Sequence, residues 1–246
     1  MKLSIVMSAY NEATTLRKIV ARVLAVELPG IEKELLIVDD GSRDGTQEVL
    51  RELDGKDGVR ALFHPRNAGK GAAVWTGMRA ASGEIVLIQD ADLEYDPREY
   101  PVLLRPILEG EADVVYGSRF LGTSEGHRVL YYWHSVGNWL LTMMSNVFTN
   151  INLTDMETCY KVMTRAVVDR LDLHSQRFGI EPEITCKVAR MKARIFEVPI
   201  SYHGRTYEEG KKIGLKDAFQ AAWTILRYFR WQSPLGVLGA DLRRPE

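Results

Sequence analysis

The chain has 246 residues, of which 46% are hydrophobic and 26% are charged, a composition typical of a soluble globular protein with one large domain or a domain with an appendage. The formal net charge is −1, and no nucleic acid is expected as a partner. Cys159 and Cys186 form no CxxC motif and have no neighbouring histidine pair, which excludes a disulfide framework and a zinc site and favours a reducing cytoplasm.

Five short apolar runs predict β-strands. The runs are rich in β-branched residues and cover residues 3–7, 35–39, 59–63, 84–88 and 113–117. The first run has no cleavage-site pattern and is expected to be a strand rather than a secretory signal. Helical patterns separate the runs, so the sequence predicts an α/β protein whose parallel sheet is buried on both faces.

The connections between these runs predict helices. In the first connection the apolar residues form one stripe of a helix that ends near Pro29, and they are Leu16, Ile19, Val20, Val23 and Leu24. A second helix is expected to open at Asp44, with Gln47 three residues later as in a capping box. Further helices fit residues 70–81 and 98–108.

Beyond residue 120 the alternation fades and a long apolar segment follows at residues 129–148. His134, Asn138 and Asn146 would each be costly at the centre of a bilayer, so the sequence argues against a transmembrane helix. A helix at a membrane interface and a helix packed on the sheet both remain open.

Residues 217–231 predict an amphipathic helix. Phe219, Trp223 and Leu226 share one stripe, with Arg227 and Arg230 at its border, which suits an anionic membrane interface; packing on the sheet explains the same stripe. This end of the sequence is also basic, because residues 187–246 hold 12 Lys and Arg against 6 Asp and Glu.

Polar residues follow each predicted strand, in the segments 8–12, 39–46, 64–71, 90–92 and 117–120. Ligands of parallel α/β sheets bind beyond the carboxyl ends of the strands, so these segments are expected to converge on one site. Asp90 and Asp92 are two residues apart and point the same way if the backbone is extended. Paired carboxylates repel unless a cation intervenes, so they favour a divalent metal that also grips a diphosphate.

Two other nucleotide sites are disfavoured. Residues 67–73 superficially resemble a phosphate-binding loop, but the first glycine of that motif is missing and Gly71 stands where Ser or Thr should follow Lys70. No GxGxxG motif follows the first strand, so a dinucleotide cofactor is not expected.

Taken as a set, the polar segments resemble those of the family 2 inverting glycosyltransferases, and within them the dolichol-phosphate mannose or glucose synthase-like branch. The matching segments are SAYNE (8–12), VDDGSRDGT (38–46), NAGKGA (67–72), QDADL (89–93), GSRF (117–120) and TDMETCYKVM (154–163). The resemblance covers about residues 1–230 and implies a GT-A fold, with a Rossmann-like, mostly parallel sheet flanked by helices and with C-terminal amphipathic helices. It also implies one catalytic domain over residues 1–232, with a nucleotide-sugar-binding half (1–118), an acceptor-binding half (119–232) and a tail (233–246).

The resemblance further implies where a nucleoside diphosphate sugar binds. The residues on the nucleotide side would be Ala9, Tyr10, Glu12, Asp40, Lys70 and Asp90. Asp92, with Asp90, would hold Mg²⁺ or Mn²⁺, and that metal would neutralise the charge that grows on the diphosphate as the sugar leaves. The resemblance leaves UDP and GDP equally open.

The acceptor implied by this branch is a polyprenyl or dolichyl phosphate at the inner face of the membrane. Such a phosphate monoester is largely dianionic at neutral pH and attacks with inversion without a general base. Its binding requires cations, and the candidates are Arg119, Arg128, Arg205 and Lys212. Residues 203–216 resemble the basic loop that closes over both phosphates in this branch, although extra residues and a Lys pair depart from its usual pattern.

Asp155 separates two classes of acceptor. In family members that use hydroxyl acceptors, a carboxylate here takes the proton of the alcohol, and Glu157, Glu181 and Glu183 are other candidates for that base. Asp155 can also cap a helix or orient an arginine. A third hypothesis is a catalytically silent nucleotide-sugar-binding protein, but such a protein has no chemical need for the paired carboxylates.

Overall fold

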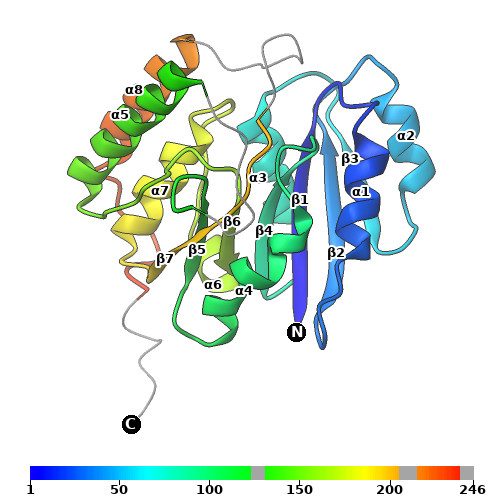
Figure 1. The fold of residues 1–246 in the computed structure, drawn as a ribbon, viewed down its shortest axis with the longest axis horizontal. Helices are drawn as coiled ribbons and strands as arrows, with labels where there is room; N and C mark the ends of the chain where they lie inside the picture. The colour runs from blue at the N-terminus through cyan, green and yellow to red at the C-terminus, as the bar shows by residue number, and fades with distance from the viewer. Residues whose placement is uncertain (123–130, 205–214, 239–246) are drawn as a thin grey trace.

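The computed structural model describes residues 1–122, 131–204 and 215–238. Its centre is a seven-stranded sheet in the order β3-β2-β1-β4-β6-β5-β7 (Figure 1). The strands are β1 (Lys2–Ala9), β2 (Glu32–Asp39), β3 (Val59–Phe63), β4 (Ile85–Asp90), β5 (Val114–Ser118), β6 (Lys161–Thr164) and β7 (Ile195–Pro199). Only β6 is antiparallel to its neighbours, β4 and β5, so the sheet is mostly parallel as expected.

The five strands predicted from the sequence are confirmed as β1 to β5. Their apolar runs are continuous because helices cover both faces of the sheet: Ile5, Leu36 and Leu87 are each 0% exposed. In Figure 1, α1 and α4 lie in front of the sheet, while α3 lies behind it. The carboxyl ends of the parallel strands β1, β2 and β4 therefore form a common edge that the helices leave accessible to a ligand.

The helices lie close to the predicted ranges. They are α1 (Leu16–Ala25), α2 (Thr46–Leu53), α3 (Lys70–Ala80), η1 (Pro97–Glu99), α4 (Tyr100–Leu108), α5 (Tyr132–Thr149), α6 (Arg165–Val168), α7 (Ile180–Arg190) and α8 (Leu215–Tyr228). The predicted apolar stripe of α1 is confirmed, since Leu16, Ile19 and Val23 are 0% exposed.

The predicted capping box of the second helix is wrong in one respect. Asp44 Oδ1 does accept a hydrogen bond from Thr46 N, at 3.1 Å, next to the first turn of α2. Gln47 does not reach back to this end of the helix; its Nε2 donates to Asp39 Oδ2 at 2.9 Å. Asp39 is a fully buried carboxylate, and the amide of Gln47 is one of the donors that stabilise it.

Helices α5 and α8 lie side by side at the end of the molecule remote from α1 and α2 (Figure 1). Their C-terminal ends meet where the rings of Phe148 and Phe229 stand with centroids 5.1 Å apart. Neither of them, nor any other helix in the described ranges, combines the length and the apolar character that crossing a bilayer requires.

Candidate active site

The ends of β1, β2 and β4 meet at one edge of the sheet. The register pairs Ala9 with Asp39 and Ser8 with Asp90, so the polar residues that follow these strands start side by side. The predicted convergence of these three segments is therefore confirmed.

Asp40, expected beside the nucleotide, is buried at the end of β2 and holds the segment that follows β3. Its Oδ1 accepts a hydrogen bond from Ala68 N at 2.8 Å, and its Oδ2 accepts one from Gly69 N at 2.7 Å. The imidazole of His64 also pairs with Oδ1, with its Nδ1 2.8 Å away. These bonds fix residues 64–69 against the end of β2, directly before the first residue of α3.

Glu12, Tyr10 and Ala9 lie at the end of β1. Thr15 Oγ1 donates to Glu12 Oε2 at 2.8 Å and lies 3.1 Å from the carbonyl oxygen of Ala91, so it connects this segment with the one that follows β4. Glu12 is 8% exposed, whereas Tyr10 is 38% exposed and offers its ring at the surface. Tyr10 is thus accessible to a planar ligand, while Glu12 is largely enclosed.

Lys70 starts α3 and links two segments that carry carboxylates, the end of β4 and the start of α7. Its Nζ lies 2.9 Å from Asp90 Oδ1 and 3.4 Å from Glu181 Oε1, and Glu181 also pairs with Lys161. Burial alone would lower the pKa of Lys70, but the charges of Asp90 and Glu181 contribute to raising it well above its ordinary value. Lys70 is therefore a permanent cation at the centre of the site.

Asp92 lies two residues beyond Asp90 and is partly buried. Its Oδ1 accepts a hydrogen bond from Glu94 N at 3.1 Å, which fixes the carboxylate within the turn. No cluster of three or more His, Cys, Asp or Glu residues suited to a metal exists among the described residues. The donor chemistry still fits Mg²⁺ or Mn²⁺, because such an ion commonly takes one or two carboxylates together with the phosphates of its substrate.

Arg119 and Asp155 form a buried ion pair, as in the alternative that Asp155 orients an arginine. Arg119 Nε lies 2.6 Å from Asp155 Oδ2, and Nη2 lies 2.7 Å from Oδ1. Asn138 on α5 contacts both partners, donating to Asp155 Oδ1 at 3.3 Å and accepting from Arg119 Nη2 at 3.2 Å. Burial would lower the pKa of Arg119, but the charge of Asp155 contributes to raising it well above its ordinary value.

The segment between Asp155 and β6 is a turn that Lys161 holds from inside. Lys161 is 0% exposed, and its Nζ donates to the carbonyl oxygens of Met156 and Thr158 as well as to Glu181. Glu157 lies at the tip of this turn. Three carboxylates, those of Asp155, Glu157 and Glu181, thus lie in the same small region as two buried cations.

The other predicted acceptor-binding cations lie outside the described residues. These are Arg128, Arg205 and Lys212, and most of the basic loop expected at 203–216 lies there too.

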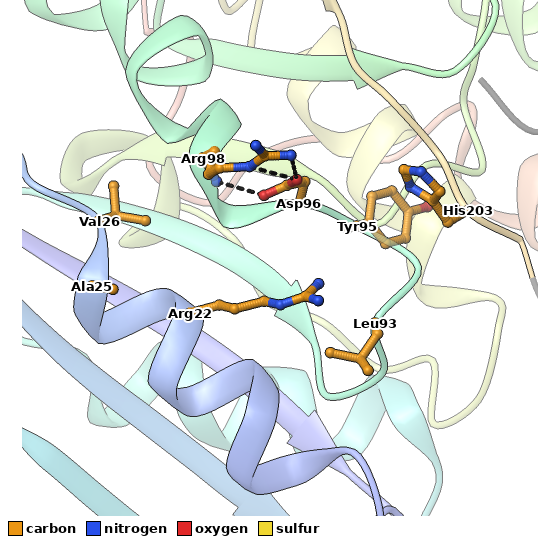
Figure 2. A pocket seen from close by; sticks show the side chains of 8 residues that line it. All are labelled: Arg22, Ala25, Val26, Leu93, Tyr95, Asp96, Arg98 and His203. Atoms are coloured by element: carbon orange, nitrogen blue, oxygen red, sulfur yellow. Dashed lines mark hydrogen bonds and ion pairs between the residues drawn. The ribbon is translucent and has the colours of Figure 1, made fainter. Parts of the chain in front are cut away.

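A cavity of about 660 Å³ borders the site from the side of α1 (Figure 2). It lies between α1 and the segment that follows β4, and Arg22 extends from the helix toward Asp96 and Leu93. Tyr95 lines the cavity, and its hydroxyl oxygen also accepts a hydrogen bond from Cys159 N at 3.1 Å. The described lining of this cavity includes neither Asp90 nor Asp92, so the convergence of charged residues lies at the open sheet edge beside it.

Sequence reasoning missed several residues that organise the site. Glu197 on β7 accepts hydrogen bonds from the backbone nitrogens of Thr154, at 2.9 Å, and Asp155, at 3.1 Å. His64 supports Asp40, and Lys161 supports the turn around Glu157. The sequence offered one signal for Lys161 and Glu197. Each is a charged residue within a short apolar run, Lys161 at the start of β6 and Glu197 in the middle of β7.

The sequence is similar to that of several known proteins. Residues 4–172 match the model of glycosyl transferase family 2. The chain is 28% identical to the dolichol-phosphate mannosyltransferase of Pyrococcus furiosus, covering 96% of this chain and 66% of that protein. It is 26% identical to the dodecaprenyl-phosphate galacturonate synthase of Rhizobium johnstonii, covering 92% of this chain and 66% of that protein. The chain thus spans just under two thirds of the length of these relatives.

Among solved structures, the chain is similar to glucosyl-3-phosphoglycerate synthase of Mycobacterium tuberculosis, in complex with Mn²⁺, UDP and glucosyl-3-phosphoglycerate. The TM-score is 0.71 at 20% identity, over 92% of this chain and 79% of that one. This likeness confirms the expected GT-A fold. The match to the family model covers more than half of the sequence, and the chain accordingly belongs to glycosyl transferase family 2.

Proposed function

We propose that the chain transfers a hexose from a UDP- or GDP-sugar to a polyprenyl phosphate, with inversion at the anomeric carbon. The observation that supports this acceptor best is the buried pair of Arg119 and Asp155. The pair uses Nε and Nη2 of the guanidinium, and within the described residues Nη1 makes no hydrogen bond. Arg119 therefore has donors left for a phosphate, and Asp155 orients it.

The donor would lie at the edge formed by β1, β2 and β4. Tyr10, exposed at the end of β1, is suited to the base, while Lys70 is suited to the diphosphate. Asp92, with Asp90, would hold Mg²⁺ or Mn²⁺, which when bound neutralises the charge of the leaving diphosphate. Asp90 already pairs with Lys70. To bind the metal as well, the carboxylate of Asp90 would have to contact both the ion and Lys70.

A lipid phosphate can attack the anomeric carbon directly. Its second pKa is ~6, so the attacking oxygen is already deprotonated at neutral pH. The rival hypothesis, a hydroxyl acceptor with Asp155 as general base, has less support. Asp155 is 0% exposed, and both of its oxygens already accept hydrogen bonds from Arg119 or Asn138, so neither is open to the hydroxyl group of an acceptor.

The proposed acceptor also accounts for the exposed aromatic surface of α5 and α8. On α5, Trp133 is 79% and Trp139 is 59% exposed, and on α8, Phe219 is 77% and Trp223 is 64% exposed. The stripe predicted for residues 217–231 is thus exposed rather than packed on the sheet. Aromatic side chains beside Arg227, which is also exposed, suit an anionic membrane surface.

Helix α5 connects this surface with the ion pair. Its inner side carries Asn138, which contacts Arg119, and Thr142, whose Oγ1 accepts from Met156 N at 3.2 Å. Its outer side carries the exposed tryptophans. A phosphate at the surface of a bilayer would therefore lie on the same side of the molecule as Arg119. We place the protein on the cytoplasmic face of the membrane, in keeping with its two buried free cysteines.

The proposal is tested by measuring nucleotide release from a panel of UDP- and GDP-sugars with Mn²⁺, with and without a short polyprenyl phosphate. We expect release to depend on the lipid phosphate and a sugar-linked lipid to form. Release that depends on a hydroxyl compound instead, and that disappears in Asp155→Asn, contradicts the proposal and supports the rival. Binding of a nucleotide sugar without release of its nucleotide under either condition would support the third hypothesis, a catalytically silent nucleotide-sugar-binding protein.

A further inference from the structure

Glu157 occupies a rigid position in the site. Lys161 Nζ donates to the carbonyl oxygens of Met156, at 3.2 Å, and of Thr158, which are the two neighbours of Glu157 in the chain. Asp155, two residues earlier, is fixed by its arginine pair. The side chain of Glu157 is therefore presented by a turn that is held at both ends, as a binding residue must be.

One oxygen of the Glu157 carboxyl group is buried without a partner. Oε1 makes no hydrogen bond with any described residue and is almost inaccessible to water. The residue as a whole is partly exposed, unlike Asp155 two positions earlier, which is 0% exposed. Thr158 Oγ1 also lacks a partner, but Thr158 is 0% exposed and a ligand cannot reach it. A buried unsatisfied oxygen costs free energy, and a bound ligand is one way to satisfy it.

Charged groups approach Glu157 from several elements. They are Glu181 on α7, Lys161 in β6, Arg119 beyond β5 and Asp155 in the same turn. Burial, followed by the charge of Glu181, raises the pKa of Glu157 to about 8. The carboxyl group is therefore mostly neutral at pH 7. A neutral carboxyl group can donate one hydrogen bond and accept another, and a hydroxyl group can do the same, so the two groups can pair with each other.

Glu157 lies near residues of both halves of the proposed site. One neighbour of Glu157 is Arg119, which is proposed to hold the acceptor phosphate. Another is Glu181, which pairs with Lys70; Lys70 in turn pairs with Asp90 on the nucleotide side. In an inverting transfer the sugar lies between the leaving diphosphate and the attacking oxygen. We propose that the carboxyl group of Glu157 binds a hydroxyl group of the hexose, an inference that rests on the proposed function.

The test compares the binding of nucleotides with and without the sugar. Calorimetric titration with Mn²⁺ measures the Kd of UDP, GDP, UDP-glucose and GDP-mannose for the wild type, Glu157→Gln, Glu157→Leu and the control Glu109→Gln. Glu109 is exposed at the end of α4 and has no part in the site. At pH 7 we expect Glu157→Leu to bind the nucleotide sugar about tenfold more weakly, with the nucleotide unaffected. Glu157→Gln, which keeps a donor and an acceptor, and Glu109→Gln should match the wild type.

The pH dependence gives a second readout. As the pH rises through about 8, Glu157 ionises and loses its donor, so the wild type should lose affinity for the nucleotide sugar but not for the nucleotide. Glu157→Gln should show no such loss. Parallel loss of nucleotide and nucleotide sugar in Glu157→Leu would indicate a structural role and overturn the inference, as would equal affinities in all variants. A wild type that binds neither UDP nor GDP would instead overturn the proposed function.

Discussion

The guanidinium of Arg119 and the carboxylate of Asp155 share two short hydrogen bonds at a site where Asp155 has no contact with solvent. Removing one partner of such a pair leaves a buried charge uncompensated, which costs about 3–5 kcal/mol. We expect Asp155→Asn and Arg119→Met each to lower the melting temperature. The double variant should lower it little more than the more destabilising of the two single variants does. Thermal denaturation of the four proteins measures this coupling, and simple additivity would show that the pair is not formed.

The pKa of Glu157 also predicts how stability changes with pH. Its folded value of about 8 lies above the ordinary 4.5, so at pH 7 the folded chain holds a proton that the unfolded chain releases. Raising the pH therefore favours unfolding. The stability that the folded chain gains by holding this proton is lost as the pH rises toward about 8. Glu157→Gln removes this dependence. We expect its melting temperature, relative to the wild type, to increase from pH 5 to pH 8; a constant difference would mean that Glu157 ionises normally.

At the scale of elements, periodicity predicted β1 to β5 and most helices because continuous apolar runs and helical stripes determine their burial. It did not predict β6 and β7. Strand β6 has four residues and begins with a buried lysine, and β7 carries Glu197 turned toward the backbone of Thr154. Such polar residues can be buried in a strand because partners far away in the sequence form hydrogen bonds with them. A single sequence does not reveal those partners.

The same limit applies to the site. The segments that converge on the sheet edge could be predicted, since parallel strands end together. The pairs Lys70–Asp90 and Arg119–Asp155 could not, because each joins residues at least twenty positions apart through the packing of whole elements. Arg119 was expected to bind a phosphate and Asp155 to act as a base or orient an arginine; the structure brings both into one ion pair.

The start of α3 depends on close packing that only glycine permits. A Cβ atom on Gly71 would lie 2.1 Å from the carbonyl oxygen of Ser175, whereas a Cβ atom on Gly137, inside α5, would meet nothing within 4 Å. We expect Gly71→Ala to destabilise the protein by about 1–3 kcal/mol and to displace Lys70 from Asp90. Gly137→Ala should be stabilising by roughly 0.5–1 kcal/mol, since alanine favours a helix. Denaturant titration of both variants compares them, and equal effects would contradict the packing argument.

At the scale of the whole molecule, the proposed function connects the exposed surface of α5 and α8 with the charged edge of the sheet. Helix α5 contributes Asn138 to the ion pair on one side and two exposed tryptophans on the other. A lipid phosphate whose chain stays in the bilayer can reach Arg119 only if the bilayer lies against this end of the molecule. The nucleotide sugar, which comes from water, would reach the opposite half, where β1 and β2 end.

This arrangement predicts binding to vesicles that depends on both helices. Burying an indole at a membrane interface is favourable through its apolar area, and the neighbouring Arg227 and Arg230 add attraction to anionic lipids that salt weakens. We expect the protein to float with vesicles of phosphatidylglycerol more than with vesicles of phosphatidylcholine. The double variant Trp139→Ser, Trp223→Ser should bind at least about tenfold more weakly, a loss of about 1.4 kcal/mol. Leu108→Ser, which changes a side chain that is 46% exposed on α4, is the matched control and should bind like the wild type. Equal flotation of both variants would show that the surface of α5 and α8 does not contact the bilayer.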